Sequence, residues 1–142
     1  SAVPIRVARV AEVNDAQRIA LAATFLGAVA GAPTAYTRRV FRAPYPCRLR
    51  AASATIGTTL AAAAVNFLSL RLSAGGTNVT AALTTAATAL TADTPRAFTV
   101  TEAAADLDAG DVVICTLTPA TADGSLDLQA SEFLVDCEIV PR

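Results

Sequence analysis

Apolar and polar residues alternate in several separate stretches of this chain, and this alternation constrains the fold more than any other sequence feature. A period of two is the pattern of a β-strand that buries one face. In the clearest stretch, near the C-terminus, the residues expected to be buried are Phe133, Val135, Cys137 and Ile139. We therefore expect a fold made mainly of half-buried strands.

Other stretches make equally specific predictions. The stretch at 47–52 places Cys47, Leu49 and Ala51 on one face and Arg48, Arg50 and Ala52 on the other. In two further stretches the inward residues are expected to be Leu68, Leu70 and Leu72, and then Phe98 and Val100. The β-branched run at 112–115 predicts a central strand that is covered on both faces.

Residues that favour turns separate these stretches. Gly75-Gly76 follows the leucine stretch, prolines interrupt 43–46, and aspartate stands with glycine or proline at 93–95, 108–111 and 123–125. Glycine supplies positive φ angles and aspartate bonds the nearby backbone, so both are favoured in turns. Short strands with turns at this spacing predict an all-β, antiparallel, jelly-roll-like β-sandwich.

The chain is expected to divide into an N-terminal arm and connecting segment at 1–38 and a sandwich domain at 39–142. Within this plan, residues 15–30 fit either a short helix capped by Asn14 or Asp15, or a strand in which Ile19 and Leu21 share a face. Residues 77–92 carry a weak helical spacing, but their threonines favour extended chain. The expected sandwich is therefore compatible with one short helix.

The composition removes most catalytic chemistry. The chain of 142 residues contains no histidine, lysine, methionine or tryptophan, and all 11 basic residues are arginine. This excludes a Ser-His-Asp or Cys-His nucleophile, a Schiff-base lysine, a P-loop lysine and a zinc site with histidine ligands. We expect no enzymatic activity, no catalytic residue and no cofactor.

Four acids near the turn at 108–111 are the remaining candidates for metal binding or acid–base chemistry. They are Glu102, Asp106, Asp108 and Asp111. Aspartate is favoured in such turns because its side chain bonds the local backbone, and a structural turn is the preferred interpretation. A calcium loop is the alternative, although the EF-hand spacing and its terminal glutamate are missing. We expect no metal.

Three cysteines, at 47, 115 and 137, show no Cys-x-x-Cys spacing. One disulfide is arithmetically possible. Because the alternation turns Cys47 and Cys137 inward, we expect buried free thiols that act as small hydrophobic side chains.

Charge is distributed unevenly along the chain. Residues 1–72 carry a formal charge of +7 and residues 73–142 carry −8, although the net charge is only −1. Either the two halves interleave and neutralise one another, or the molecule has one face suited to docking on a charged partner. Nucleic acid is not expected as a partner, because the arginines do not cluster with aromatic residues or glycines.

A membrane is not expected as a partner either. The longest charge-free apolar stretch, at 19–37, is mostly alanine and contains two glycines and a proline, so it would insert poorly. No signal peptide is evident in the sequence. Synthesis in a bacterial cytoplasm is the simplest expectation.

Two groups of residues are candidates for partner binding. The first ten residues look extended, and a terminal segment of this kind is poorly ordered unless it binds something. A second group of arginines precedes the strand at 47–52, and alternation would place Arg38 and Arg42 on one side and Arg39 on the other. The candidate residues are Ile5, Arg6, Val7, Arg9, Val10, Arg38, Arg39 and Arg42.

Residues 41–54 read Phe-Arg-Ala-Pro-Tyr-Pro-Cys-Arg-Leu-Arg-Ala-Ala-Ser-Ala, and residues 107–113 read Leu-Asp-Ala-Gly-Asp-Val-Val. These two pieces resemble the "F-x-A-P-(F/Y)-x-(C/G)" opening and the "A-G-D" step of small β-sandwich proteins in the structural modules of tailed bacteriophages. The resemblance covers roughly residues 39–140. Members of these modules include head decoration (cement) proteins and head or tail fibre proteins, which are generally non-enzymatic and often trimeric.

The resemblance implies a capsid decoration protein that binds the outside of a phage head and stabilises it. Its expected partners are the major capsid protein and itself, as a homotrimer, and its expected location is the virion surface. The alternative is a fibre or tail module that binds the host surface. Because the chain has only Tyr36 and Tyr45 besides its phenylalanines, stacking against sugars is less favoured.

Overall fold

The computed structural model describes residues 19–26, 35–120 and 132–142 of the chain. Its long strands are β1 (Ile19–Leu26), β2 (Tyr36–Arg42), β3 (Cys47–Ile56), β4 (Phe67–Ala74), β9 (Val112–Ala120) and β10 (Glu132–Pro141). Between β4 and β9 lie four strands of two residues each, β5 (Thr77–Asn78), β6 (Leu83–Thr84), β7 (Arg96–Ala97) and β8 (Asp106–Leu107). The only helix within the described residues is one short 3₁₀ turn, η1 (Glu102–Ala104).

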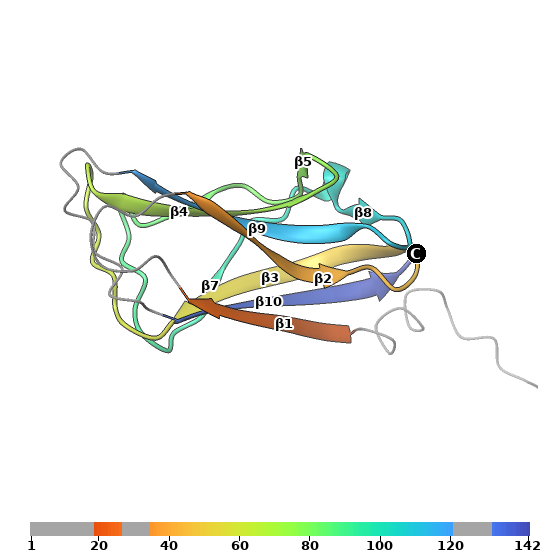
Figure 1. Ribbon diagram of the computed structural model, residues 1–142, viewed down its shortest axis with the longest axis horizontal. Helices are drawn as coiled ribbons and strands as arrows, with labels where there is room; N and C mark the ends of the chain where they lie inside the picture. Colours follow the sequence, from red (N-terminus) through yellow and green to blue (C-terminus); the bar gives the residue numbers. More distant parts are fainter. Residues whose placement is uncertain (1–18, 27–34, 121–131) are drawn as a thin grey trace, which may run out of the picture.

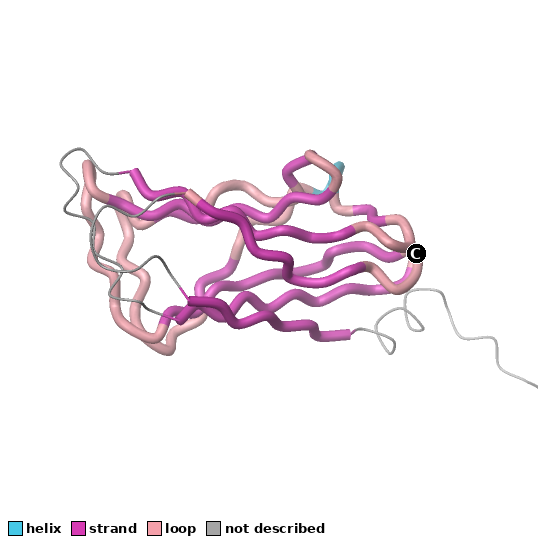
Figure 2. Tube along the Cα trace, viewed as in Figure 1, coloured by secondary structure: helices cyan, strands magenta, loops and turns pink. Residues whose placement is uncertain are grey.

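The strands form two antiparallel sheets that pack face to face (Figures 1 and 2). Sheet A has the order β1-β10-β3-β7, and β8 also pairs with β3; sheet B has the order β2-β9-β4-β5, and β6 also pairs with β4. The first four strands alternate between the sheets, and the last two strands return beside the first two. This wrapped order is that of a jelly roll. The expected jelly-roll-like β-sandwich is therefore confirmed.

Strand β1 and the start of β2 lie within 1–38, the range expected to form an arm and a connecting segment. Strand β1 pairs with β10 along its whole length, from Ile19 opposite Ile139 to Leu26 opposite Glu132. The sheets therefore include residues from Ile19 onward. Where 15–30 is described, the strand alternative is confirmed. Residues 1–18, the first part of the expected arm and connecting segment, lie outside the described residues.

The core lies between the two sheets and follows the predicted alternation. The residues predicted to face inward that are buried are Cys47, Leu49, Leu68, Leu70, Leu72, Phe98, Phe133, Val135, Cys137 and Ile139. Val100 is half-buried. All three cysteines are free and buried, as expected. The sequence pattern thus identified a large part of the core in both sheets.

A bulge in β3 changes the predicted alternation at one point. On β10, Glu138 pairs with Ala51 while the next residue, Ile139, pairs with Leu49, so Arg50 is an extra residue in β3. An extra residue on one strand reverses which later side chains face the core. Ala52 is therefore buried and Ala51 is exposed, the opposite of the prediction.

A second bulge lies in β2 and corrects the arginine pattern. Arg39 pairs with Ile114 and Phe41 with Val113, so Val40 is the extra residue. As a result, Arg39 and Arg42 share the outward face of sheet B. Arg38 pairs with the buried Cys115 and occupies the inward-facing side of this edge strand. The prediction that Arg38 and Arg42 share a side was therefore wrong.

Strand β9 is central in sheet B, between β2 and β4, as the run at 112–115 predicted. However, only alternate residues such as Val113 and Cys115 are buried, while Val112 and Ile114 are half-buried. In an antiparallel sandwich only one face of each sheet packs on the core, so the second face stays partly exposed. The expectation of cover on both faces was wrong.

The threonine-rich segment 77–92 is extended rather than helical. It follows β4 closely, and two buried threonine hydroxyls take the place of a regular strand partner. Thr80 Oγ1 accepts a hydrogen bond from Leu72 N at 3.1 Å, and Thr85 Oγ1 accepts one from Leu68 N at 3.0 Å. These two bonds satisfy backbone donors that would be costly to bury unpaired.

The stretch 98–101 does not form a continuous strand. Only Arg96–Ala97 pairs as a ladder with β3, and Val100 makes an isolated bridge with Thr80. Backbone bonds from Phe98 N to Ala52 O and from Thr101 N to Val79 O, both 2.9 Å long, tie this stretch to both sheets. Together with 77–85, it closes one side of the sandwich.

Two of the predicted turns depend on positive φ angles at glycine. Gly75 and Gly76, with φ of 58° and 81°, connect β4 to β5 as a tight hairpin turn. Gly110, with φ of 94°, lets the chain turn from β8 into β9, and a Cβ there would lie 3.3 Å from Arg42 Nη2. A side chain at either site would strain the backbone. The expected turn at 123–125 lies outside the described residues.

We expect Phe133→Ala to lower the free energy of unfolding by about 3–5 kcal/mol, because it opens a cavity at a fully buried site on the strand between β1 and β3. Urea unfolding of the variant and the wild type measures this difference. A loss below about 1 kcal/mol would show that the inward register of β10 is wrong.

The buried thiols predict a loss of stability at high pH. Burial raises the pKa of Cys115 and of Cys137 from 9.0 to about 12. Because the pKa of the buried thiol is higher in the folded state than in the unfolded state, the contribution of this thiol to the free energy of unfolding is complete below pH 9. That contribution is lost as the pH rises toward 12. Cys115→Ala should therefore lose less stability than the wild type over this interval. Parallel losses measured by urea unfolding would contradict this assignment.

Candidate interaction surface

Charged residues are distributed unevenly between the two sheets. All five strands of sheet B lie within the described residues. They carry no aspartate or glutamate and four arginines, which are Arg38, Arg39, Arg42 and Arg71. The strands of sheet A carry charges of both signs: four acids, Glu132, Asp136, Glu138 and Asp106, and three arginines, Arg48, Arg50 and Arg96. The two halves of the chain therefore interleave in both sheets, as one alternative expected, and docking on a charged partner stays a prediction.

The outward surface of sheet B, which we call the basic face, is formed by Arg39, Arg42, Arg71, Ile114 and Thr116. Arg71 on β4 pairs with Thr116 on β9, and Arg39 on β2 pairs with Ile114. All three arginines are exposed. Within the part of the chain that the structure describes, their guanidinium groups make no hydrogen bond or salt bridge. Three cations thus surround a half-buried isoleucine, which suits a flat acidic partner.

A shallow hollow of about 320 Å³ lies beside Arg71 on the basic face. The residues that line it are Ser69, Arg71, Asn78, Ala82, Thr116 and Thr118. Hydroxyl and amide groups surround the guanidinium group, so the hollow can donate several hydrogen bonds to a carboxylate.

The outward surface of sheet A carries Glu132, Asp136 and Glu138, the exposed arginines Arg48 and Arg50, and several small residues. A hollow of about 410 Å³ on this face is lined by Ala20, Ala51, Ala52, Ser53, Ala97, Asp136, Cys137 and Glu138. Small side chains, mostly alanines, surround Asp136 and Glu138 in this hollow.

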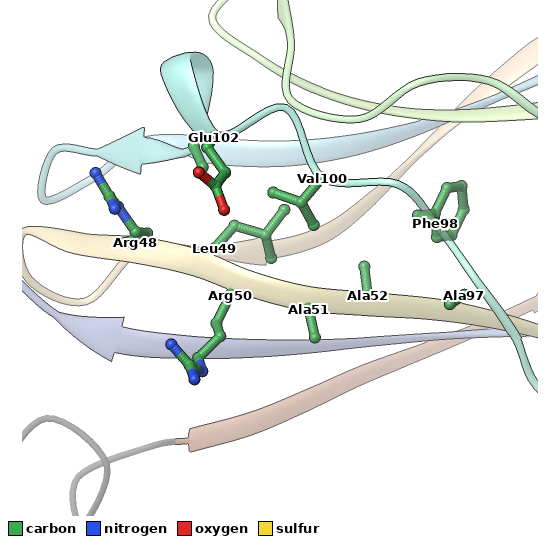
Figure 3. A pocket seen from close by; sticks show the side chains of 10 residues that line it. Arg48, Leu49, Arg50, Ala51, Ala52, Ala97, Phe98, Val100 and Glu102 are labelled. Carbon is green, nitrogen blue, oxygen red and sulfur yellow. The ribbon is translucent and has the colours of Figure 1, made fainter.

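A further hollow of about 330 Å³ lies between β3 and the segment 97–105 (Figure 3). Glu102 and Val100 extend over it, Ala51 and Ala52 form part of its floor, and Arg48 stands at one end. Glu102 is the only acid among its lining residues. Catalysis by paired carboxylates needs a second acid, so this hollow is not built for it.

The acids of the 106–111 turn are held by arginines and by the backbone. Asp106 Oδ1 accepts a hydrogen bond from Arg48 Nε at 2.8 Å, and this bond holds the pKa of Asp106 below its usual value. Asp108 Oδ1 pairs with Arg142 Nη2 at 2.6 Å. Asp111 Oδ2 accepts a bond from the backbone N–H of Asp108 at 2.8 Å. The three carboxylates serve different partners, as the structural-turn interpretation predicts.

Among the described residues, no group of three or more cysteine, aspartate or glutamate side chains is placed to hold a metal ion. The expectation that the protein needs no metal stays a prediction.

The remaining candidate residues lie along one edge or outside the described chain. Three of them, Arg38, Arg39 and Arg42, are residues of β2, which lies beside β1 at the same side of the sandwich. The candidates Ile5, Arg6, Val7, Arg9 and Val10 fall within 1–18 and so lie outside the described residues. The structure thus brings the three β2 arginines together, but on two faces of the strand.

Sequence reasoning did not identify which residues lie together on each surface. Alternation within the leucine stretch indicated that Arg71 is exposed, but only sheet pairing places it with Arg39. In the same way, Asp136 and Glu138 were expected to face outward, but their alanine surroundings come from β1, β3 and β7. The sequence indicated that these residues face outward, but it did not indicate which residues of other strands lie beside them.

Searches of the described residues found no helix long and apolar enough to cross a membrane. Comparison of the chain with protein-family models, curated proteins and solved structures finds no match.

We expect EDTA to leave the melting temperature unchanged, because Asp106 and Asp108 are neutralised by arginines rather than by a cation. Calorimetric melts with EDTA and with added calcium test this. A fall of many degrees on chelation, reversed by calcium, would instead assign a calcium site to the 106–111 turn.

Proposed function

We propose that this protein is a capsid decoration protein, which attaches to the outside of a phage head through the side of the sandwich formed by β1 and β2. One observation carries this proposal: among the described residues, the outer backbone edges of β1 and β2 pair with no other strand. Within the described residues, β1 pairs only with β10 and β2 pairs only with β9. A free edge can accept a strand from another protein.

The opposite side of the sandwich is not available in this way. There the segments 77–85 and 96–101 bridge β4 to β3 through backbone bonds such as Ala81 N to Thr99 O, 2.9 Å long. The sandwich therefore has a closed side, formed by these segments, and an open side, formed by β1 and β2. Attachment through the open side leaves the closed side pointing away from the shell.

The chemistry of the open side favours an acidic partner. Strand β2 contains Arg38, Arg39 and Arg42. An arginine guanidinium binds a carboxylate through two parallel hydrogen bonds. We therefore propose acidic side chains of the major capsid protein as the contact. Such charge pairs at an exposed rim increase the rate of association and its specificity more than its affinity.

Two further arguments support this proposal by analogy. The jelly roll is a fold that viral capsid proteins use, although a fold by itself does not establish a function. The resemblance of 41–54 and 107–113 to phage structural modules implies the virion surface as the location and a homotrimer as the assembly. On this proposal the protein needs no cofactor and performs no catalysis.

Deletion of residues 1–14 is expected to leave the sandwich folded and to weaken attachment to heads. The apolar and basic residues of this segment precede β1, whose free edge lies on the proposed contact side. Circular dichroism and urea unfolding report the fold, and mass spectrometry of purified heads reports the copies bound per capsid protein.

The full-length chain mixed with the same heads is the control. If the truncated protein decorates heads at full occupancy, residues 1–14 have no role in docking. If neither protein binds heads, the decoration function itself is wrong.

A further inference from the structure

We propose that the hollow beside Arg71 on the basic face, which we call the Arg71 hollow, binds a carboxylated sugar unit of an acidic polysaccharide. The residues that line it are Ser69, Arg71, Asn78, Ala82, Thr116 and Thr118. This inference goes beyond attachment to a shell. The hollow lies over β4 and β9, whereas the proposed shell contact uses the edges of β1 and β2.

The hollow exists because the chain beside β4 bends into the sandwich at this point. Strand β4 pairs with β6 at Ser69 and with β5 at Ser73, and among the described residues no strand pairs with it on this side at Arg71. The chain between β5 and β6 turns inward instead, where Thr80 is buried and its Oγ1 accepts the bond from Leu72 N. The outward surface beside Arg71 is therefore left hollow.

The first argument for a ligand is the charge in the hollow. Arg71 is exposed, and its guanidinium group makes no hydrogen bond or salt bridge to any described residue. The strands of sheet B, all of which are described, contain no aspartate or glutamate that could compete for it. An arginine in this setting can bind a carboxylate through two parallel hydrogen bonds. The hollow therefore has a place for one carboxylate.

The second argument is the set of neutral polar groups around this cation. Ser69 on β4 pairs with Thr118 on β9. Arg71 pairs with Thr116 in the same way, and Asn78 adds its amide. Hydroxyl and amide groups both donate and accept hydrogen bonds, as the hydroxyl groups of a sugar do. One cation among these groups matches a sugar that carries one carboxylate and several hydroxyls.

The third argument is size. The hollow has a volume of about 320 Å³, which lies at the lower end of the range for small-molecule sites. A shallow hollow of this size has room for one sugar ring, and the rest of the polysaccharide can stay in solvent. Because the site is shallow, we expect a dissociation constant of about 0.1–1 mM for an acidic oligosaccharide.

Peptides and nucleic acids match the hollow less well. Extended peptides bind by adding a strand to a free edge or by placing side chains in apolar pockets. The hollow lies on the face of sheet B, and among the described residues that line it Ala82 is the only apolar one. Single-stranded nucleic acid stacks its bases on aromatic side chains, and none of these lining residues is aromatic. A sugar is therefore the ligand class that the lining favours.

The hollow also stays accessible when the open side of the sandwich is attached to a shell. Sheet B has the order β2-β9-β4-β5, so the hollow is displaced from the β2 edge toward the closed side. A protein attached through β1 and β2 can therefore bind a polysaccharide at the same time.

Titration of the isotope-labelled whole chain, followed by NMR at about 0.15 M salt, tests the proposal. The probe is a trimer of galacturonic acid, and its methyl ester, which keeps the sugar hydroxyls but has no charge, is the matched ligand control. We expect the acid to shift the backbone signals of 69–71, 78 and 116–118 and to bind at least about tenfold more tightly than the ester. Equal affinity for the two ligands, or shifts centred on β2 instead, overturns the proposal.

A capped triglutamate peptide separates a sugar site from a general anion site, because it presents three carboxylates without sugar hydroxyls. We expect it to bind at least about threefold more weakly than the acidic trisaccharide, since it cannot use the hydroxyl groups of the hollow. Equal or tighter binding of the peptide overturns the assignment to a sugar.

Two substitutions remove groups that line the hollow. Arg71→Gln should weaken binding of the acidic trisaccharide at least about tenfold and leave binding of its ester nearly unchanged. Thr116→Val keeps the shape of the side chain and removes its hydroxyl, so it should weaken both ligands about threefold. If neither substitution changes the affinity, the ligand does not bind in the hollow.

The matched control variant is Arg50→Gln, which removes the same charge from an exposed position on sheet A. It should change the affinity for the acidic trisaccharide less than about twofold, because exposed charges beyond a Debye length are screened. A loss as large as that of Arg71→Gln would show that net charge attracts the ligand, and the proposal is then overturned.

Urea unfolding and the NMR spectrum without ligand establish that each variant is folded. Should Thr116→Val unfold, Thr118→Val replaces it in the same titration. A protein that binds heads but not the acidic trisaccharide overturns this inference and leaves the decoration function intact. A protein that binds the trisaccharide in the hollow but fails to bind heads does the reverse.

Discussion

The pairing of β10 between β1 and β3 is the interaction on which the rest of the structure depends. This strand comes last in the chain, yet it is the central strand of sheet A and holds the first described strand in place. Its inward residues Phe133, Val135 and Cys137 lie in the middle of the core. These contacts join residues that are far apart in the sequence. The sandwich therefore depends on long-range contacts, and such contacts slow folding.

The two sides of the sandwich differ because only one is closed by additional chain. On the closed side, the hydroxyls of Thr80 and Thr85 and the backbone of 96–101 satisfy the polar groups at the edges of β4 and β3. On the other side, β1 and β2 keep free edges within the described residues. Natural sheets usually cover or charge their edges, and β2 carries three arginines. The proposed attachment to a shell uses this difference.

The uneven charge of the two sheets follows from how the chain distributes its strands. The arginine-bearing strands β2 and β4 both enter sheet B, where they flank β9, which has no charged residue. The acidic strand β10 enters sheet A among alanines of β1 and β3. Sheet B thereby acquires a basic outward face, whereas sheet A carries acids together with Arg48 and Arg50.

The sequence by itself determined the class of fold, a large part of the core and the main turns, because burial on one face of a strand enforces a period of two. It also indicated that residues such as Arg71 and Asp136 are exposed. Only the tertiary structure decided the places where a strand carries an extra residue. Such an extra residue exists only relative to a partner strand, so no local pattern reveals it. For the same reason the sequence misplaced Ala52 and Arg42, and which arginines share a face was settled by strand pairing alone.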